Sequence, residues 1–167
     1  MKLPDANKLV DQLAQAIGPA LNEKSALVGI HTGGVWIAQQ LQRLLRLEAP
    51  IGTLDIAFYR DDYSRIGLHP KVKPSDIPFE VENRDIFLVD DVLYTGRTVR
   101  AAMNVLFDYG RPAGIRLVVL VDRGGRELPI AAQYVGVTLK LESHQNVALN
   151  RDEHGALTLS LHNGSPT

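Results

Sequence analysis

The chain has 167 residues, a length that suits one domain, and 45% of them are hydrophobic, which is enough to form a buried core. Because it contains no cysteine, a disulfide framework, a thiolate zinc site and a cysteine nucleophile are all excluded. Its formal net charge is −1. A dedicated nucleic-acid-binding protein usually has an excess of basic residues that neutralise phosphates, and this chain has no such excess overall.

The first part of the chain alternates between helical and strand-like patterns. In chain order we expect a helix over 5–17, a strand over 26–30, a helix over 35–47 and a strand over 53–59. In the first of these, Leu9, Leu13 and Ile17 recur every four residues, and Gly18-Pro19 ends the pattern. The turn Thr32-Gly33-Gly34 separates the second element from the third.

The segment 60–78 differs from its surroundings because it is polar, contains three prolines and shows no periodicity. A loop of this length inside a compact domain is usually either a functional lid or a disordered segment. We therefore expect one domain over residues 1–167 that carries a lid loop at about 60–78.

The second part of the chain continues the alternation. We expect a strand over 86–89, a helix with Val99, Ala102, Leu106 and Tyr109 on one face that ends at Gly110, and further strands over 117–121, 134–139, 147–149 and 156–161. Alternation of this kind indicates an α/β fold with a mainly parallel central sheet flanked by helices.

Chemistry concentrates where the 86–89 strand ends. The residues that follow it are Asp90-Asp91-Val92-Leu93-Tyr94-Thr95-Gly96-Arg97-Thr98. A parallel strand delivers its carboxyl end to the crevice where α/β proteins bind ligands, and two acids there can accept hydrogen bonds from ribose hydroxyls or hold Mg²⁺. The start of the next helix offers unpaired N–H groups and a positive dipole end, which suit a phosphate.

Each half of this motif also has an ordinary structural interpretation. An Asp-Asp pair after a strand is often only a turn, and threonine at a helix start is often only a cap. The two halves together, in this order and spacing, favour a ribose 5-phosphate site. The motif is neither a Walker A loop nor a dinucleotide fingerprint, because both of those glycine patterns are missing from the chain.

The residues from 86 to 98 resemble the phosphoribosyl-pyrophosphate (PRPP) motif of type I phosphoribosyltransferases. The longer stretch 90–101, together with 110–112, 121–130 and Tyr59-Arg60-Asp61-Asp62, resembles the PyrR family. That family comprises regulators of pyrimidine operons that also have uracil phosphoribosyltransferase activity. The resemblance implies the type I phosphoribosyltransferase fold with a small hood or lid loop.

The resemblance also implies a reaction and the residues that serve it. Uracil and PRPP would give UMP and pyrophosphate with the help of Mg²⁺. Asp90 and Asp91 would engage the ribose hydroxyls, and Thr95–Thr98 the 5′-phosphate. Thr32, Gly33 and Gly34 would bind pyrophosphate, the loop with Tyr59, Arg60, Asp61 and Asp62 would close over the site, and Asp122, Arg123 and Gly124 would lie beside the base and metal. Asp90, Asp91 and Asp122 are the candidate protein contacts of the metal.

The secondary sites have ordinary alternatives as well. Thr32-Gly33-Gly34 can be only a strand-to-helix turn, Arg60-Asp61-Asp62 only a solvated loop, and Asp122-Arg123 only a surface ion pair, which would contribute little to stability. We expect His31 to pack or bond locally and Trp36 to belong to the core.

Several positions depart from the better-known PyrR pattern. Gly33 stands where the family usually has arginine, and Gly125 where it often has histidine. Asp11, Gln12 and Gln15 replace a threonine, an arginine and a histidine of the RNA-binding members. Ala131, Ala132 and Val137 stand where basic residues are common. Loss of cations weakens phosphate binding directly, so we rank the enzyme above its alternative, an RNA-binding attenuation regulator that senses UMP.

The remaining expectations concern partners and location. The candidate RNA contacts are Arg100, Arg111, Arg116, Arg126 and Lys140. No apolar run reaches the ~18 residues that span a bilayer, and the N-terminus lacks the apolar segment of a signal peptide, so we expect a cytoplasmic protein without membrane contact. The family implies a homo-oligomer, either a dimer or a tetramer.

Overall fold

The computed structural model describes residues 1–56 and 75–164. Five parallel strands form the central sheet in the order β2-β1-β3-β4-β5. Their bounds are β1 Ser25–Ile30, β2 Gly52–Leu54, β3 Asp85–Leu93, β4 Gly114–Asp122 and β5 Tyr134–Thr138. The helices are α1 Ala6–Ile17, the short 3-10 helix η1 Gly18–Ala20, α2 Gly33–Leu44 and α4 Arg97–Tyr109, and β6 Gln145–Arg151 pairs with β7 Leu157–Asn163 as an antiparallel hairpin. The expected α/β fold is confirmed.

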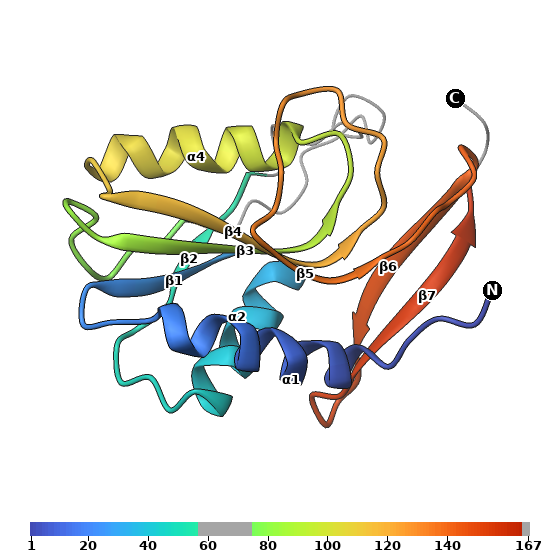
Figure 1. Cartoon of the computed structure of the whole chain (residues 1–167), viewed down its shortest axis with the longest axis horizontal. Helices are drawn as coiled ribbons and strands as arrows, with labels where there is room; N and C mark the ends of the chain where they lie inside the picture. Colours follow the sequence, from blue (N-terminus) through green and yellow to red (C-terminus); the bar gives the residue numbers. More distant parts are fainter. Residues whose placement is uncertain (57–74, 165–167) are drawn as a thin grey trace.

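Helices cover both faces of the sheet (Figure 1). The α1 and α2 side holds one core cluster, to which the β6–β7 hairpin adds Val147, Leu149 and Leu157. The α4 side holds a second core cluster. Because both faces are covered, the central strands are buried almost continuously, as parallel strands usually are.

The carboxyl ends of the strands, the first turn of α4 and part of the hairpin lie at one end of the sheet, on the right in Figure 1. This arrangement follows from the parallel order, since every strand that crosses over through a helix delivers its carboxyl end to the same edge. Any site built from strand ends and helix starts must therefore lie there.

Several expected boundaries are corrected by the structure; the strands expected over 117–121, 147–149 and 156–161, for example, are longer as β4, β6 and β7. The strand expected over 86–89 runs on to Leu93, because Val92 and Leu93 still pair with Val121 and Asp122 of β4. The polar Asp-Asp pair thus lies inside the strand rather than in a loop after it. Of the strand expected over 53–59, the structure assigns β2 to Gly52–Leu54, and residues 57–59 lie outside the described residues.

The helix expected over 35–47 begins two residues earlier and ends at Leu44. It ends in a Schellman motif: Arg46 has φ 53°, its N–H donates to the carbonyl of Arg43, and the N–H of Leu47 donates to the carbonyl of Gln42. Glycine or asparagine usually marks such an end, and an arginine gives no such signal, which is why the periodicity alone overran it.

The expected apolar face of α4 is also partly wrong. Val99, Ala102 and Leu106 are buried as expected, but Tyr109 is 47% exposed. Tyr109 is the last residue of the helix, three residues beyond Leu106. Among the described residues, no helix has the length and apolar character needed to cross a membrane.

Candidate functional site

Two carboxylates mark the carboxyl end of β3. Asp90 is only 3% exposed, and Asp91 is partly buried. Their Oδ1 atoms accept hydrogen bonds from the N–H groups of Asp91 (2.9 Å) and Val92 (2.8 Å), respectively. Because side chains alternate along a strand, Asp91 follows Val89 towards α2, and Asp90 points towards the α4 side. The pair therefore presents carboxylate oxygens to both sides of the strand end.

The turn Thr32-Gly33-Gly34 lies directly against this strand end. A Cβ atom added to Gly33 would meet the carboxylate of Asp91, and one added to Gly34 would meet the carbonyl oxygen of Val89. Only glycine allows so close an approach of two backbones. The structure therefore brings the predicted pyrophosphate turn and the predicted acid pair together, although they are nearly 60 positions apart in the sequence.

The segment after β3 forms a compact bend that opens α4. Thr95 is 7% exposed, and Gly96, at φ 93°, occupies the N-cap position of the helix. Glycine adopts this left-handed conformation without strain. The Oγ1 of Thr95 accepts a hydrogen bond from the N–H of Arg97 (3.2 Å). Since no acidic residue occupies the first turn of α4, its N–H groups and positive dipole end favour an anion.

The segment 122–130 holds that bend in place from outside. The N–H groups of Glu127 and Leu128 donate to the carbonyl of Thr95 at 2.9 and 3.2 Å, and the side chains of Leu128 and Ile130 pack against Gly96. At the rim, Arg97 donates to Glu127 across 2.6 Å, an exposed ion pair of small energetic value. The bend thus depends on residues about thirty positions further along the chain.

Arg126 connects the bend at residues 94–98 to the segment 122–130. Its guanidinium donates to the carbonyl of Tyr94 (2.9 Å), the carbonyl of Ile130 (2.8 Å) and the carboxylate of Asp122 (2.6 Å). All three acceptors belong to this chain, and the Arg126 side chain is only 24% exposed. Sequence reasoning named Arg126 only as an RNA contact and missed this role, because none of its acceptors is recognisable from local sequence.

The ion pair considered for Asp122 and Arg123 forms between Asp122 and Arg126 instead. Burial by itself raises the pKa of Asp122, but the hydrogen bonds from Arg126 and from the N–H of Gly124, together with the charge of Arg126, outweigh burial and lower the pKa below its ordinary value. Arg123 lies over the ring of Tyr94, 3.9 Å from its centroid, and donates to Asn146 of β6 (2.8 Å). Asp122 is therefore a stable anion at neutral pH.

The other candidate residues are scattered. Arg116 faces Asp85 at 3.6 Å and lies over the ring of Phe87, whereas Arg100, Arg111 and Lys140 are exposed. The lid residues Tyr59, Arg60, Asp61 and Asp62 lie outside the described residues. Gly125, at φ 80°, packs so closely on the Tyr94 ring that a Cβ atom there would lie 2.5 Å from Cε2, so the family's histidine would require Tyr94 to move.

A magnesium ion fits this site only in company with a ligand. Within the described ranges, no group of three or more histidine, aspartate or glutamate side chains could enclose a metal ion. Asp90 and Asp91 nevertheless offer the carboxylate oxygens that Mg²⁺ prefers, and this ion usually takes its remaining ligands from substrate phosphates and water.

Comparisons with known proteins identify the family of the chain. Residues 3–152 match the phosphoribosyl transferase domain family. The chain is 50% identical over 163 residues to the bifunctional protein PyrR of Pseudomonas savastanoi pv. phaseolicola. This alignment covers 95% of this chain and 96% of that protein. The chain is 51% identical over 160 residues to the bifunctional protein PyrR of Nitrosococcus oceani, covering 89% and 90%.

Solved structures give the same fold. A hypoxanthine phosphoribosyltransferase from Staphylococcus aureus superposes with a TM-score of 0.66, covering 86% of this chain and 76% of that one. A hypoxanthine-guanine phosphoribosyltransferase from Bacillus anthracis also gives 0.66 and covers 85% and 81%. Their identities to this chain are 22% and 20%, so they support the fold alone and carry no information about the base.

Proposed function

The chain belongs to the PyrR family of phosphoribosyl transferase domain proteins, and on that premise we propose that it transfers the phosphoribosyl group of PRPP to uracil, giving UMP and pyrophosphate. In this reaction the bond from the anomeric carbon to pyrophosphate breaks while a bond to uracil N1 forms, and the N1 proton of uracil passes to pyrophosphate or to water. Positive charge develops on the sugar and negative charge on the leaving group.

The residues at the strand end have separate tasks in this proposal. Asp90 and Asp91 accept hydrogen bonds from the two ribose hydroxyls of PRPP and fix the sugar. The N–H groups at the start of α4 and the hydroxyl groups of Thr95 and Thr98 hold the 5′-phosphate. The backbone of Thr32–Gly34 receives the departing pyrophosphate, which it can stabilise without a protein nucleophile.

One observation carries the proposal: the glycine turn at 33–34 packs against residues 89–91. A ribose held by the acid pair would then have its anomeric carbon next to the pyrophosphate turn, and its 5′-phosphate next to the start of α4. Gly33 and Gly34 allow the turn to approach the strand end this closely, because neither carries a Cβ atom.

Magnesium fits this scheme as a partner of the substrate. Asp90 and Asp91 would contact it, because the carboxylate of Asp122 already pairs with Arg126. When bound, Mg²⁺ neutralises charge that accumulates on pyrophosphate. The protein's own contribution is to orient the sugar through the carboxylates of Asp90 and Asp91.

The substrate assay that tests the proposal offers radiolabelled uracil, orotate, adenine and hypoxanthine separately with PRPP and Mg²⁺. We expect labelled UMP from uracil and no comparable product from the other three bases. Turnover of a purine alone would remove the uracil assignment, and no turnover of any base would leave a PRPP-binding protein without catalysis.

Regulation of pyrimidine gene expression is the second function in the proposal, because relatives of this family that are half identical to the chain are named bifunctional. Of the candidate RNA contacts, Arg116 and Arg126 already form ion pairs within the fold. Arg100, Arg111 and Lys140 therefore remain as the residues that would contact RNA. Filter binding of pyrimidine-operon leader RNA, with and without UMP, tests this function.

We expect a homo-oligomer, a dimer or tetramer, in sedimentation.

A further inference from the structure

A pocket of about 690 Å³ lies along the outer side of α2, and none of residues 32–34, 90–98 or 122–125 lines it. Its volume lies in the range of small-molecule sites. The walls combine three arginines, Arg43, Arg46 and Arg151, with Trp36 and three glutamines. The proposed transfer reaction uses none of these side chains, so the pocket is separate from the catalytic centre.

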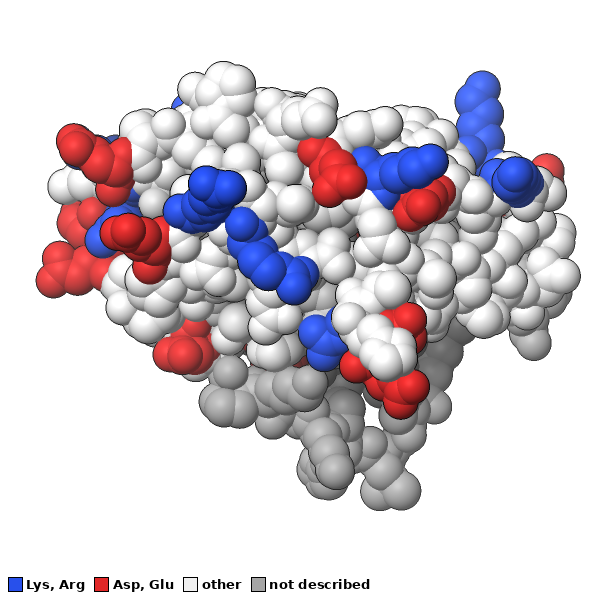
Figure 2. All heavy atoms as spheres, turned by 90° about the horizontal axis from the view of Figure 1, so that it is seen from below, with Lys and Arg blue, Asp and Glu red and all other residues white. Residues whose placement is uncertain are grey.

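The charge on this side of α2 is of one sign. Trp36, Gln40 and Arg43 recur at i, i+4 and i+7 and therefore share one helical face. No aspartate or glutamate occurs from residue 31 through 47, whereas a solvated helix face usually mixes both signs. Figure 2, which views the α1 and α2 side, shows a short row of basic side chains near the middle of this face with no acidic side chain between them.

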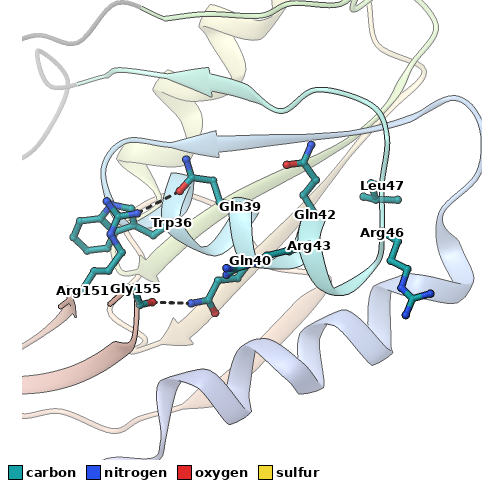
Figure 3. A pocket seen from close by; sticks show the side chains of 9 residues that line it. All are labelled: Trp36, Gln39, Gln40, Gln42, Arg43, Arg46, Leu47, Arg151 and Gly155. Carbon is teal, nitrogen blue, oxygen red and sulfur yellow. Dashed lines mark hydrogen bonds between the residues drawn. The ribbon is translucent and has the colours of Figure 1, made fainter. Parts of the chain in front are cut away.

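At one end of the pocket, Trp36 and Arg151 form a cation–π pair, which we call the Trp36–Arg151 platform (Figure 3). The Arg151 guanidinium lies over the Trp36 ring, 4.8 Å from its centroid, and donates a 3.3 Å hydrogen bond to Oε1 of Gln39. Guanidinium groups and aromatic rings both offer a face on which a nucleobase can stack. Beside it, Gln40 donates to the carbonyl of Gly155 at 3.2 Å, which leaves its Oε1 for a ligand.

The other end supplies positive charge that the described residues do not neutralise. Neither Arg43 nor Arg46 forms a side-chain hydrogen bond or an ion pair within the described part of the chain. Arg46 also occupies the left-handed position of the Schellman motif, where glycine would be less strained. Two guanidinium groups with free donors are the usual protein partners of phosphate oxygens.

Two acidic residues of the turn between β6 and β7 point to partners outside the pocket. Asp152, in the turn between β6 and β7, accepts hydrogen bonds from the N–H groups of His154 and Ala156. Glu153 faces His154 at 3.4 Å. Neither side chain lines the pocket, and the described residues that line it include no aspartate or glutamate.

We propose that this pocket binds a free nucleotide, with its base on the Trp36–Arg151 platform and its phosphates between Arg43 and Arg46. Trp36 and Arg43 lie two helical turns apart, about 10 Å along the axis, so inorganic phosphate is too small to contact both ends. A long RNA strand would need a continuing basic track, which a chain of net charge −1 with scattered arginines does not offer.

Trp36 is the only tryptophan of the chain, so its fluorescence reports on this pocket. The experiment titrates the full chain with ATP and, separately, with UTP. We expect a saturable change in Trp36 fluorescence. Replacing Arg43→Gln and Arg46→Gln together should raise the half-saturating nucleotide concentration at least tenfold. Replacing Lys8→Gln and Lys24→Gln together removes the same charge from exposed positions outside the pocket and should leave that concentration unchanged.

Two further arms separate this site from the catalytic centre. In a chain with Asp90→Asn and Asp91→Asn, the fluorescence change should persist, and its loss would place the nucleotide at the catalytic centre and overturn the proposal. The proposal also fails if the pocket variant and the lysine control respond alike, or if single-stranded RNA alters the signal and nucleotides do not. Formation of UMP from uracil and PRPP, measured in parallel, reports on the proposed function independently.

Discussion

Replacing Arg126 by methionine keeps an unbranched apolar stem and removes the guanidinium that joins residues 94 and 130 to Asp122. Hydrogen bonds that involve a charged group contribute about 1.5–3 kcal/mol each, but three bonds from one group are not additive. Removing one partner of a buried ion pair costs about 3–5 kcal/mol. Asp122 remains 20% exposed, so water recovers part of that loss, and we expect the free energy of unfolding to fall by about 2–4 kcal/mol.

The same substitution should weaken the hold on PRPP, because Arg126 positions the bend that starts α4 without touching the substrate. We expect the KM for PRPP to rise at least tenfold while the KM for uracil changes little. Urea unfolding and initial-rate kinetics measure both effects. Lys24→Met, which removes an exposed basic residue far from this site, serves as the control. Arg126→Lys keeps the charge but loses the forked geometry of the guanidinium, so its stability and its KM for PRPP should lie between those of the parent and those of Arg126→Met.

Adding Asp122→Asn to Arg126→Met removes the carboxylate that the first substitution leaves unpaired, so the double variant should recover part of the lost stability. The reasoning about Arg126 would be refuted if Arg126→Met unfolded within about 0.5 kcal/mol of the parent, the usual scatter of surface substitutions, and kept its KM for PRPP.

The remaining predictions concern the strand end and its supports. Asp90→Asn together with Asp91→Asn should abolish UMP formation while the circular dichroism spectrum stays unchanged, and retained activity would contradict the ribose-binding role. Gly34→Ala forces a Cβ atom against a carbonyl oxygen of β3 and should lower the free energy of unfolding by about 1–3 kcal/mol in urea titrations. Gly114→Ala, where the added Cβ atom would meet only one atom at 3.9 Å, is the control. Because the pKa of Asp122 is lowered in the folded chain, its pairing stabilises the fold above the carboxyl's ordinary pKa of 3.8 and loses that effect as the pH falls through the folded value. The stability difference between the parent and Asp122→Asn should therefore be large at pH 7 and shrink below about pH 4, and a difference independent of pH would exclude the ion pair as its cause.

Local patterns were sufficient for the fold class and for the principal motif. Periodicity located α1, α2 and α4, and buried apolar runs located β1, β3 and β4, because each of these elements buries a face that its own sequence defines. The Asp-Asp pair and the Thr-Gly-Arg-Thr segment were recognisable because a strand end and a helix start follow each other within nine residues.

Features that depend on distant partners could not be read from the sequence. β3 continues through Asp90 and Asp91 because β4 supplies the pairing, and nothing in the local pattern signals this. Arg126 takes its acceptors from Tyr94 and Ile130, and the choice of Arg126 rather than Arg123 as the partner of Asp122 depends on the path of the loop between them. The pocket along α2 likewise forms only when the β6–β7 turn folds back onto the helix.

A crystal structure of the chain with bound UMP tests the central claim most directly. The phosphate of UMP should lie within hydrogen-bond distance of the N–H groups of residues 95–98, with the ribose hydroxyls on the carboxylates of Asp90 and Asp91. A phosphate bound elsewhere, with residues 95–98 contacting only solvent, would contradict the assignment of this strand end to a ribose 5-phosphate.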